Sequence, residues 1–99
     1  MFMVMSTYRA KAGEEDAIIA MHENWQTGQS VQAKAYLSWE LFRNVDTPQD
    51  FIDITHFENE ESAAAMIHHL DQDAWLSRLV SLMEGAPVYT SCICEWQAR

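Results

Sequence analysis

The order of strand-like and helix-like segments constrains the fold of this chain more than any single motif does. Runs of β-branched, aromatic and other apolar residues with alternating polarity predict four strands. These strands cover Phe2–Arg9, Ala35–Arg43, Asp50–Phe57 and Val88–Trp96. One helix is predicted after the first strand, and one or two follow the third strand. The order is therefore β-α-β-β-α(α)-β, which is the arrangement of a ferredoxin-like α+β domain.

Apolar residues spaced three or four apart define the predicted helices. They cover Glu14–Gln26, Glu60 to about Leu70, and a segment that starts at Asp71 or Asp73 and ends at Gly85. Asn59 is expected to cap the second helix, and Pro87 follows the last one. That last helix places four apolar residues on one side, Trp75, Leu79, Leu82 and Met83. Turns are predicted at Ala12–Gly13, Thr27–Ser30 and Asn44–Gln49.

The predicted sheet has large apolar side chains on both of its faces. Helices cover one face of an antiparallel sheet in this arrangement and leave the other open. That open face would bear Met3, Met5 or Trp39, or their neighbours on the opposite face. Such a patch exceeds what monomeric proteins usually expose. We therefore expect a homodimer in which the sheet of a second copy closes the open face, so that two sheets form a dimeric α/β barrel.

Length and charge limit the classes of protein to which this chain can belong. The chain has 99 residues with six Lys and Arg against fifteen Asp and Glu, a formal charge of −9. This length predicts one domain that spans residues 1–99. The sequence isoelectric point near 4.6 argues against nucleic acid as a partner, because binding phosphates requires clustered Lys and Arg. An anionic membrane surface is disfavoured for the same reason.

The sequence also predicts the compartment. No run approaches the roughly 20 apolar residues that cross a bilayer. The apolar start, Met1–Met5, is too short for a signal peptide and lacks a basic segment. Cys92 and Cys94 share one face of a predicted strand, where their Cβ atoms point in parallel, so reduced thiols are expected. These features together predict a cytoplasmic protein.

Several segments spread over essentially the whole chain resemble one family. They are Lys11–Gly13 after the first strand, His22 and Trp25 on the first helix, Asn44–Pro48, Phe57–Glu61, and His69–Trp75. In this order they resemble the antibiotic-biosynthesis monooxygenase family of dimeric α/β barrels. Family members commonly have Trp at the position of Phe57. The resemblance rests on a pattern of elements, so it bears more directly on fold than on activity.

The resemblance implies chemistry without a prosthetic group. Some family members oxidise polycyclic phenols, anthrones or quinols with O₂, and others degrade haem with an Asn on the first strand. This chain has Ser6 and Thr7 in the matching stretch and no Asn, which disfavours haem degradation. We expect a cofactor-independent monooxygenase that acts on a small aromatic phenol or quinol. The alternatives are a ligand-binding or stress-related dimer without catalysis, and a purely structural dimer.

Two residues are expected to be catalytic, His69 and Trp75. The resemblance implies both, although either His68 or His69 could match the family's histidine. Histidine suits acid–base work near neutral pH. Trp75 could form a pocket wall with its indole N–H as a polar group. Core packing of Trp75 and solvent exposure of the histidine are the structural alternatives.

Four further residues are expected to bind substrate, Ser6, His22, Trp25 and Arg78. His22 and Trp25 are three apart on the first predicted helix and are therefore surface neighbours. Arg78 lies one turn beyond Trp75 and could hold an anionic substrate oxygen. Alternatively, Trp25 packs in the core, His22 is half-exposed, and Arg78 pairs with a nearby carboxylate. No metal is expected, because the histidines show no HxH or HxxxH spacing.

Overall fold

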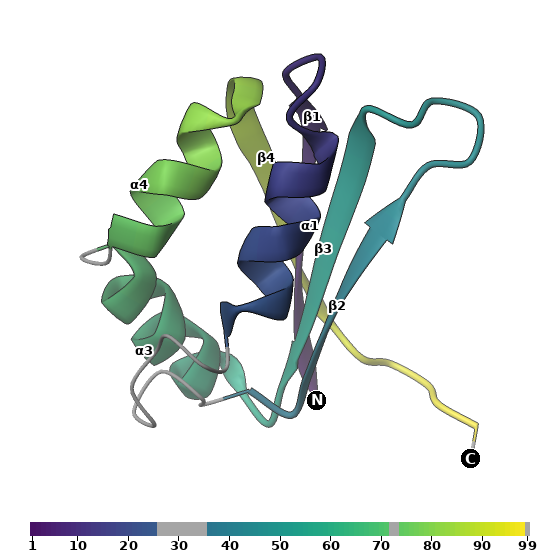
Figure 1. The fold of residues 1–99 in the computed structure, drawn as a ribbon. Coiled ribbons are helices and arrows are strands. Elements are labelled where there is room, and N and C mark those ends of the chain that lie inside the picture. The colour runs from purple at the N-terminus through teal and green to yellow at the C-terminus, as the bar shows by residue number, and fades with distance from the viewer. Residues whose placement is uncertain (26–35, 72–73, 99) are drawn as a thin grey trace.

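The computed structural model describes residues 1–25, 36–71 and 74–98. In chain order its elements are β1 (Phe2–Ala10), α1 (Glu15–Glu23), β2 (Ser38–Arg43), β3 (Asp50–Phe57), α3 (Glu60–Asp71), α4 (Ala74–Ser81) and β4 (Met83–Ile93) (Figure 1). The predicted order and the ferredoxin-like α+β class are confirmed. The parts of the prediction that fall on Gln26, Thr27–Ser30, Ala35 and Asp73 lie outside the described residues.

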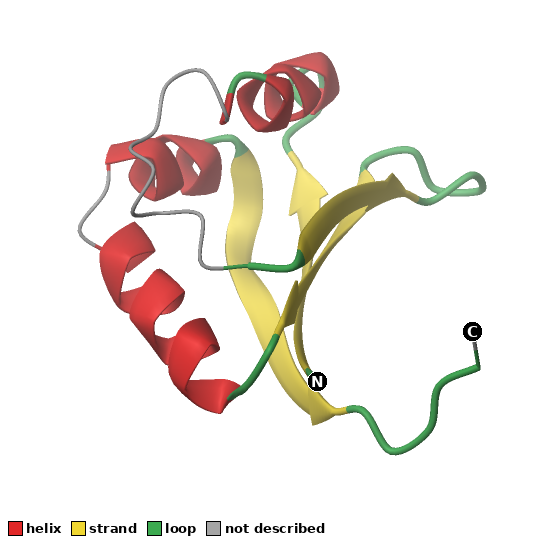
Figure 2. Ribbon diagram, turned by 90° about the horizontal axis from the view of Figure 1, so that it is seen from below, coloured by secondary structure: helices red, strands yellow, loops and turns green. Residues whose placement is uncertain are grey.

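The strands β1 to β4 form one antiparallel sheet in the order β2-β3-β1-β4. At its centre, Met5 of β1 lies opposite Ile54 of β3 and Thr90 of β4. Figure 2 shows the helices gathered on one side of the curved sheet, while the described chain leaves the other side bare. Within the described residues, no helix is long and apolar enough to cross a bilayer.

Alternation along the strands separates a helix-covered face from an uncovered face. The core side chains that β1 and β3 place on the helix-covered face are Val4, Tyr8, Ala10, Phe51 and Phe57, each at most 8% exposed. Trp39 of β2 lies on this face as well, packed against that core. The uncovered face bears the apolar residues Met3, Met5, Phe42, Ile52, Ile54 and Val88. The helix-covered face therefore holds the core, and the uncovered face has no counterpart within the described chain.

Local hydrogen bonds fix the turns and the start of α3. The side-chain oxygen of Asn59 accepts a hydrogen bond from the backbone N–H of Ser62 at 2.8 Å, which confirms the predicted cap. In the β2–β3 connection, the side-chain oxygen of Asn44 accepts from the N–H groups of Asp46 and Thr47 at 2.8 and 2.9 Å. The connection therefore closes around Asn44, as its composition predicts.

The boundary between α4 and β4 differs from the prediction. Helix α4 ends at Ser81, and Met83 begins β4, so the expected helix through Met83 to Gly85 is wrong. Gly85 has a φ of +74° and lies inside the strand, where the pairing with β1 is irregular between Thr7 and Arg9. A glycine with positive φ suits a β-bulge as well as a helix end, so its presence alone did not distinguish the two.

The end of β4 also differs from the prediction. The strand stops at Ile93 rather than at Trp96, and the chain then extends away from the body of the molecule (Figures 1 and 2). Trp96 is 83% exposed in this segment. The N–H of Cys94 still donates to the carbonyl of Met1 at 3.0 Å. Cys92 is half-buried and Cys94 is exposed, and both thiols are free, as expected.

Replacing Gly85 by Ala is expected to lower the free energy of unfolding by about 1–2 kcal/mol, because an L side chain is strained at positive φ. No atom lies within 4 Å of the Cβ that the substitution would add, so the loss is conformational rather than steric. Gly85→Asn should lose less, since Asn tolerates this backbone region. Urea denaturation measures both variants. Equal stability of wild type and Gly85→Ala would contradict the assignment of the bulge.

Candidate functional site

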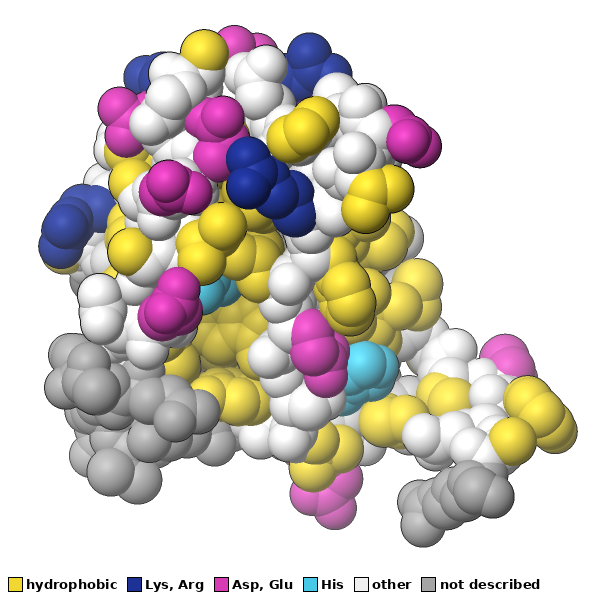
Figure 3. Space-filling model, turned by 45° about the vertical axis from the view of Figure 1, so that its right-hand side comes forward, with side chains coloured by type: hydrophobic (Ala, Val, Ile, Leu, Met, Phe, Trp, Pro, Cys, Tyr) yellow, Lys and Arg dark blue, Asp and Glu magenta, His cyan; other side chains and the backbone are white. Residues whose placement is uncertain are grey.

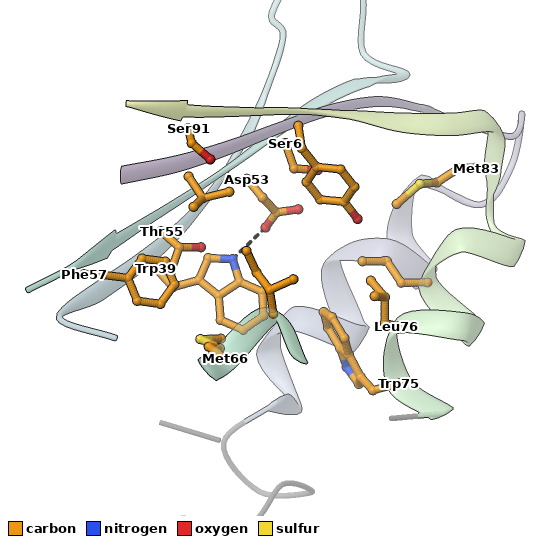
Figure 4. A pocket seen from close by; sticks show the side chains of 14 residues that line it. Ser6, Trp39, Asp53, Thr55, Phe57, Met66, Trp75, Leu76, Met83 and Ser91 are labelled. Carbon is orange, nitrogen blue, oxygen red and sulfur yellow. Dashed lines mark hydrogen bonds between the residues drawn. The ribbon is translucent and has the colours of Figure 1, made fainter. Parts of the chain in front are cut away.

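A cavity of about 420 Å³ lies between the helix-covered face of the sheet and the helices α3 and α4, and we call it the inner cavity. Most of its lining is apolar or aromatic, with Trp39 from β2, Met66 from α3 and Trp75 from α4 among the walls (Figure 4). Its polar lining consists of hydroxyl groups and one carboxylate, that of Asp53. A cavity of this volume and composition is typical of a small-molecule site.

Asp53 is the buried carboxylate of this cavity. It lies on β3 at a position that alternation assigns to the core face, between Phe51 and Thr55, and is 7% exposed. Burial of an unpartnered carboxylate would cost several kcal/mol. Its two oxygens accept three hydrogen bonds instead. The Tyr8 hydroxyl donates to Oδ2 at 2.6 Å, and the Trp39 indole and His22 Nε2 each lie 2.7 Å from Oδ1.

The contacts of His22 determine its protonation. Its Nδ1 lies 2.8 Å from the carbonyl oxygen of Ile18, one turn back along α1, and its Nε2 faces Asp53. A carbonyl and a carboxylate both accept hydrogen bonds, so both ring nitrogens donate. Burial lowers the pKa of His22, but the hydrogen bond and charge of Asp53 outweigh burial and raise that pKa above its usual value. His22 and Asp53 thus form a largely buried imidazolium–carboxylate pair.

Tyr8 is the hydroxyl-bearing partner of Asp53, and sequence reasoning did not identify it. Burial, and then the negative charge of Asp53, raise the pKa of the Tyr8 hydroxyl far above its ordinary value. The hydroxyl is therefore neutral and acts as a fixed donor. Its ring stacks on Phe51 with a centroid distance of 6.0 Å. Tyr8 anchors the side of Asp53 that faces β1.

Three tryptophans surround the ion pair. Trp25, Trp39 and Trp75 meet edge to face, with ring centroids 5.0 to 5.6 Å apart. The His22 ring packs against Trp39 and Trp75 in the same manner, at 5.5 and 5.4 Å. Trp75 also donates to the carbonyl of Met21 at 3.1 Å. These contacts join α1, β2 and α4 into one aromatic cluster that holds the pair in place.

A second, more open pocket of about 500 Å³ lies on the other side of this cluster, between α1 and β2. We call it the outer pocket, and it is lined by His22, Glu23, Trp25 and residues 36–39 and 41. Figure 3 shows hydrophobic side chains at the floor of a hollow on this side, with histidine surface beside them. Trp39 lines both spaces, whereas Asp53 lines only the inner one. The indole of Trp39 thus forms part of the partition between them.

The structure places the six expected site residues in different surroundings. Ser6 and Trp75 line the inner cavity, and His22 and Trp25 line the outer pocket. His69 is half-buried on α3, and Arg78 is exposed on α4. Neither of these two belongs to the lining of either space. The structure therefore brings four of the six together around the aromatic cluster.

Sequence reasoning did not single out Tyr8, Trp39 or Asp53. A signal was present for Asp53, because an acidic residue falls on the core side of an otherwise apolar alternation in β3. No comparable signal was present for Trp39 and Tyr8, which lie 14 and 45 residues away from Asp53 along the chain. Within the described residues, no three His, Cys, Asp or Glu side chains are grouped in a way that could hold a metal ion.

Comparisons with known proteins agree with this fold. No protein-family model and no curated protein sequence matches the chain. A Chloroflexus aurantiacus J-10-fl structure, provisionally named an antibiotic biosynthesis monooxygenase, matches with a TM-score of 0.75 and 16% identity over 99% of this chain and 96% of that one. A Nitrosomonas europaea structure with the same provisional name matches with a TM-score of 0.79 and 13% identity, over 97% of this chain and 100% of that one.

A structure from a second family matches as well. A NIPSNAP family protein from Agrobacterium tumefaciens str. C58 gives a TM-score of 0.69 with 16% identity, over 93% of this chain and 90% of that one. Identities this low show a shared fold and nothing finer. The expected likeness to antibiotic-biosynthesis monooxygenase structures is confirmed at that level.

Replacing His22 by Gln is expected to remove a pH-dependent part of the stability. The folded pKa of His22 lies above its unfolded value near 6.5, so the ion pair stabilises fully below that pH. The ion pair contributes about 1.4 kcal/mol of stability for each unit by which the folded pKa exceeds the unfolded one. This contribution is lost as the pH rises through the folded pKa. The stability difference between wild type and variant should therefore be largest below about pH 6.5 and should shrink as the pH rises through the folded pKa of His22.

Urea denaturation at one protein concentration measures this difference. Val45→Gln, which changes a side chain that is 91% exposed in the β2–β3 connection, is the control and should follow the wild-type pH profile. A His22→Gln variant whose stability runs parallel to that of the wild type across this pH range would contradict the ion pair.

Proposed function

We propose that this chain forms a homodimer whose inner cavity binds a small aromatic phenol or quinol and oxidises it with O₂ without a cofactor. The observation that carries the proposal is Asp53, a buried carboxylate in the wall of a largely apolar, aromatic cavity. A carboxylate there can accept the proton of a phenol while the apolar lining excludes water. The fold shared with structures named antibiotic biosynthesis monooxygenases supports this reaction class.

The proposed reaction balances for a phenol with a free para position. The hydroxyl proton passes to Asp53, and the phenolate gives one electron to O₂, forming a ring radical and superoxide. These combine through a new C–O bond, and the proton returns from Asp53 to give a hydroperoxide. The hydroperoxide loses the ring proton and its terminal hydroxyl as water, leaving a quinone carbonyl. The substrate gains one oxygen atom, and the other leaves in water.

The surrounding side chains have supporting roles in this proposal. Trp75 and Ser6 line the cavity and would contact the ring and oxygen of the substrate. His22 pairs with Asp53 at 2.7 Å and positions that carboxylate, and Trp25 supports the indoles of Trp39 and Trp75. The catalytic role of His69 and the substrate-binding role of Arg78 stay predictions that substitution can test.

The uncovered face is the surface that we propose to pair with a second copy. It carries apolar side chains on all four strands, and two of them, Phe42 and Val88, are 50% and 62% exposed. Exposed apolar side chains gathered on one face in this way are rare in monomers. Closure by a second sheet follows the sheet-on-sheet packing that antiparallel sheets allow. The free thiol of Cys92 lies on this face and fits a reducing, cytoplasmic setting.

Binding without chemistry is the second function that the site supports. The same cavity would hold an aromatic ligand whether or not O₂ reacts with it, and the fold occurs in proteins of more than one name. Haem degradation is disfavoured, because Ser6 and Thr7 occupy the stretch where the haem-degrading relatives have an Asn. No described Lys or Arg lines the cavity to pair with haem propionates either.

The proposal predicts O₂ consumption by metal-stripped protein in the presence of naphthols, anthrones or catechols. Asp53→Asn should lower kcat/KM by about 100-fold or more, because removal of a general base typically costs at least that. Trp75→Phe should keep the fold while changing the cavity wall. An oxygen electrode measures the rate, and the quinone product is identified by absorbance.

Matched substitutions make this experiment specific. Asp46→Asn, in the exposed β2–β3 connection, and Trp96→Phe, in the exposed C-terminal segment, should keep wild-type activity. His69→Ala, run beside them, tests the catalytic role predicted for that histidine. Absence of O₂ uptake across the panel, with saturable binding retained, would replace oxidation by the binding function.

The proposed dimer predicts a sedimenting species of twice 11.4 kDa at micromolar concentration. Ile54→Lys should yield monomer, because it buries a charge at the centre of the uncovered face. Val45→Lys is the control and should remain dimeric, since Val45 is 91% exposed in the β2–β3 connection. Sedimentation equilibrium separates the two states. A wild-type monomer would refute the barrel.

A further inference from the structure

We infer that the inner cavity takes its aromatic ligands as neutral hydrogen-bond donors and excludes the corresponding anions, a selection made by Asp53. The inference rests on the proposed function only in treating the inner cavity as the ligand site. It does not depend on whether the bound ligand reacts with O₂. It names the charge state that the ligand must have in order to enter.

The hydrogen bonds of Asp53 leave one acceptor position. Each carboxylate oxygen can accept about two hydrogen bonds. Oδ1 accepts from both His22 and Trp39 at 2.7 Å, so its positions are filled. Oδ2 accepts from Tyr8 at 2.6 Å, and the bonds seen among the described residues leave its second position open. Because Asp53 lines the cavity, a ligand O–H or N–H can take that position.

No Lys, Arg or His side chain is among the described residues that line this cavity, so the lining itself offers no positive charge to an anion. The other polar groups of the lining are hydroxyls, including those of Ser6 and Thr55. Arg9 pairs with Asp50 at 2.8 Å, and Arg78 is exposed on α4. A carboxylate or phenolate ligand would therefore bring a second negative charge beside Asp53 in a site of low dielectric. The net charge of −9 adds a field of the same sign.

The titratable groups that face Asp53 do not change this conclusion. Tyr8 on β1 is a neutral donor, and Tyr89 on β4 acts on Tyr8 in the same direction as Asp53 does. His22 on α1 is the one cation among these groups, and both of its N–H groups are already engaged, with Ile18 and with Asp53. An anionic ligand would have to displace Asp53 from His22 to gain a counter-charge.

Three ligands with the same ring system test the inference by equilibrium dialysis near neutral pH. 2-Naphthol should bind the wild-type protein at least about tenfold more tightly than naphthalene, because a hydrogen bond to a carboxylate contributes that much or more. 2-Naphthoate should bind more weakly than naphthalene. Equal binding of 2-naphthol and 2-naphthoate would overturn the inference, as would a failure of 2-naphthol to bind.

Substitution of Asp53 assigns the selection to that residue. Asp53→Asn should abolish the preference for 2-naphthol over naphthalene. It should also strengthen the binding of 2-naphthoate relative to both, because an amide can donate a hydrogen bond to an anion. Asp46→Asn is the matched control and should keep the wild-type order of affinities. An Asp53→Asn variant that retained the wild-type order would overturn the assignment.

A measurement on the wild type alone keeps the inference testable if Asp53→Asn does not fold. 4-Nitrophenol ionises near neutral pH, so one ligand presents both charge states to the same protein. Its affinity should fall about tenfold for each pH unit above its own pKa, while that of 2-naphthol, still neutral there, controls for titration of the protein. Unchanged affinity on ionisation would overturn the inference. Selective binding without O₂ uptake would support it and refute only the proposed oxidation.

Discussion

The burial of one carboxylate, that of Asp53, is the constraint on which the arrangement of this molecule depends. A buried charge is tolerated only when its hydrogen bonds are supplied, and here the donors come from three separate elements. Tyr8 reaches it from β1, His22 from α1 and Trp39 from β2. These contacts fix how α1 lies across the sheet. They also place a hydrogen-bond acceptor in the wall of an apolar cavity, so one feature serves both folding and ligand recognition.

The fold was predictable wherever local patterns agree with tertiary structure. Alternation in β1 and β3 located both strands, and Asn59 marked the start of α3. The prediction was wrong at the α4–β4 boundary, because Leu82 and Met83 continue the apolar spacing of the helix while the strand has already begun. The positive φ at Gly85 is explained by a bulge that only pairing with β1 creates. The sequence of β4 alone does not reveal that it pairs with β1 at this point.

The candidate site was less predictable because its contacts are non-local. His22, Trp25 and Trp75 were identified from residue type and helical spacing, and each does lie in the aromatic cluster. Asp53 was not singled out, since a lone acidic residue in a strand usually faces solvent. Tyr8 and Trp39 reach it from the strands on either side of β3, and His22 reaches it only when α1 folds over the sheet.

A crystal structure of the protein with bound 2-naphthol tests the central claim most directly, because it shows where the ligand lies and which atom it contacts. The account predicts the naphthol ring in the inner cavity, against Trp39 and Trp75. Its oxygen should lie about 2.5–2.7 Å from Oδ2 of Asp53, the distance of a charge-assisted O–H···O bond. A naphthol in the outer pocket, or one whose oxygen points away from Asp53, would contradict it.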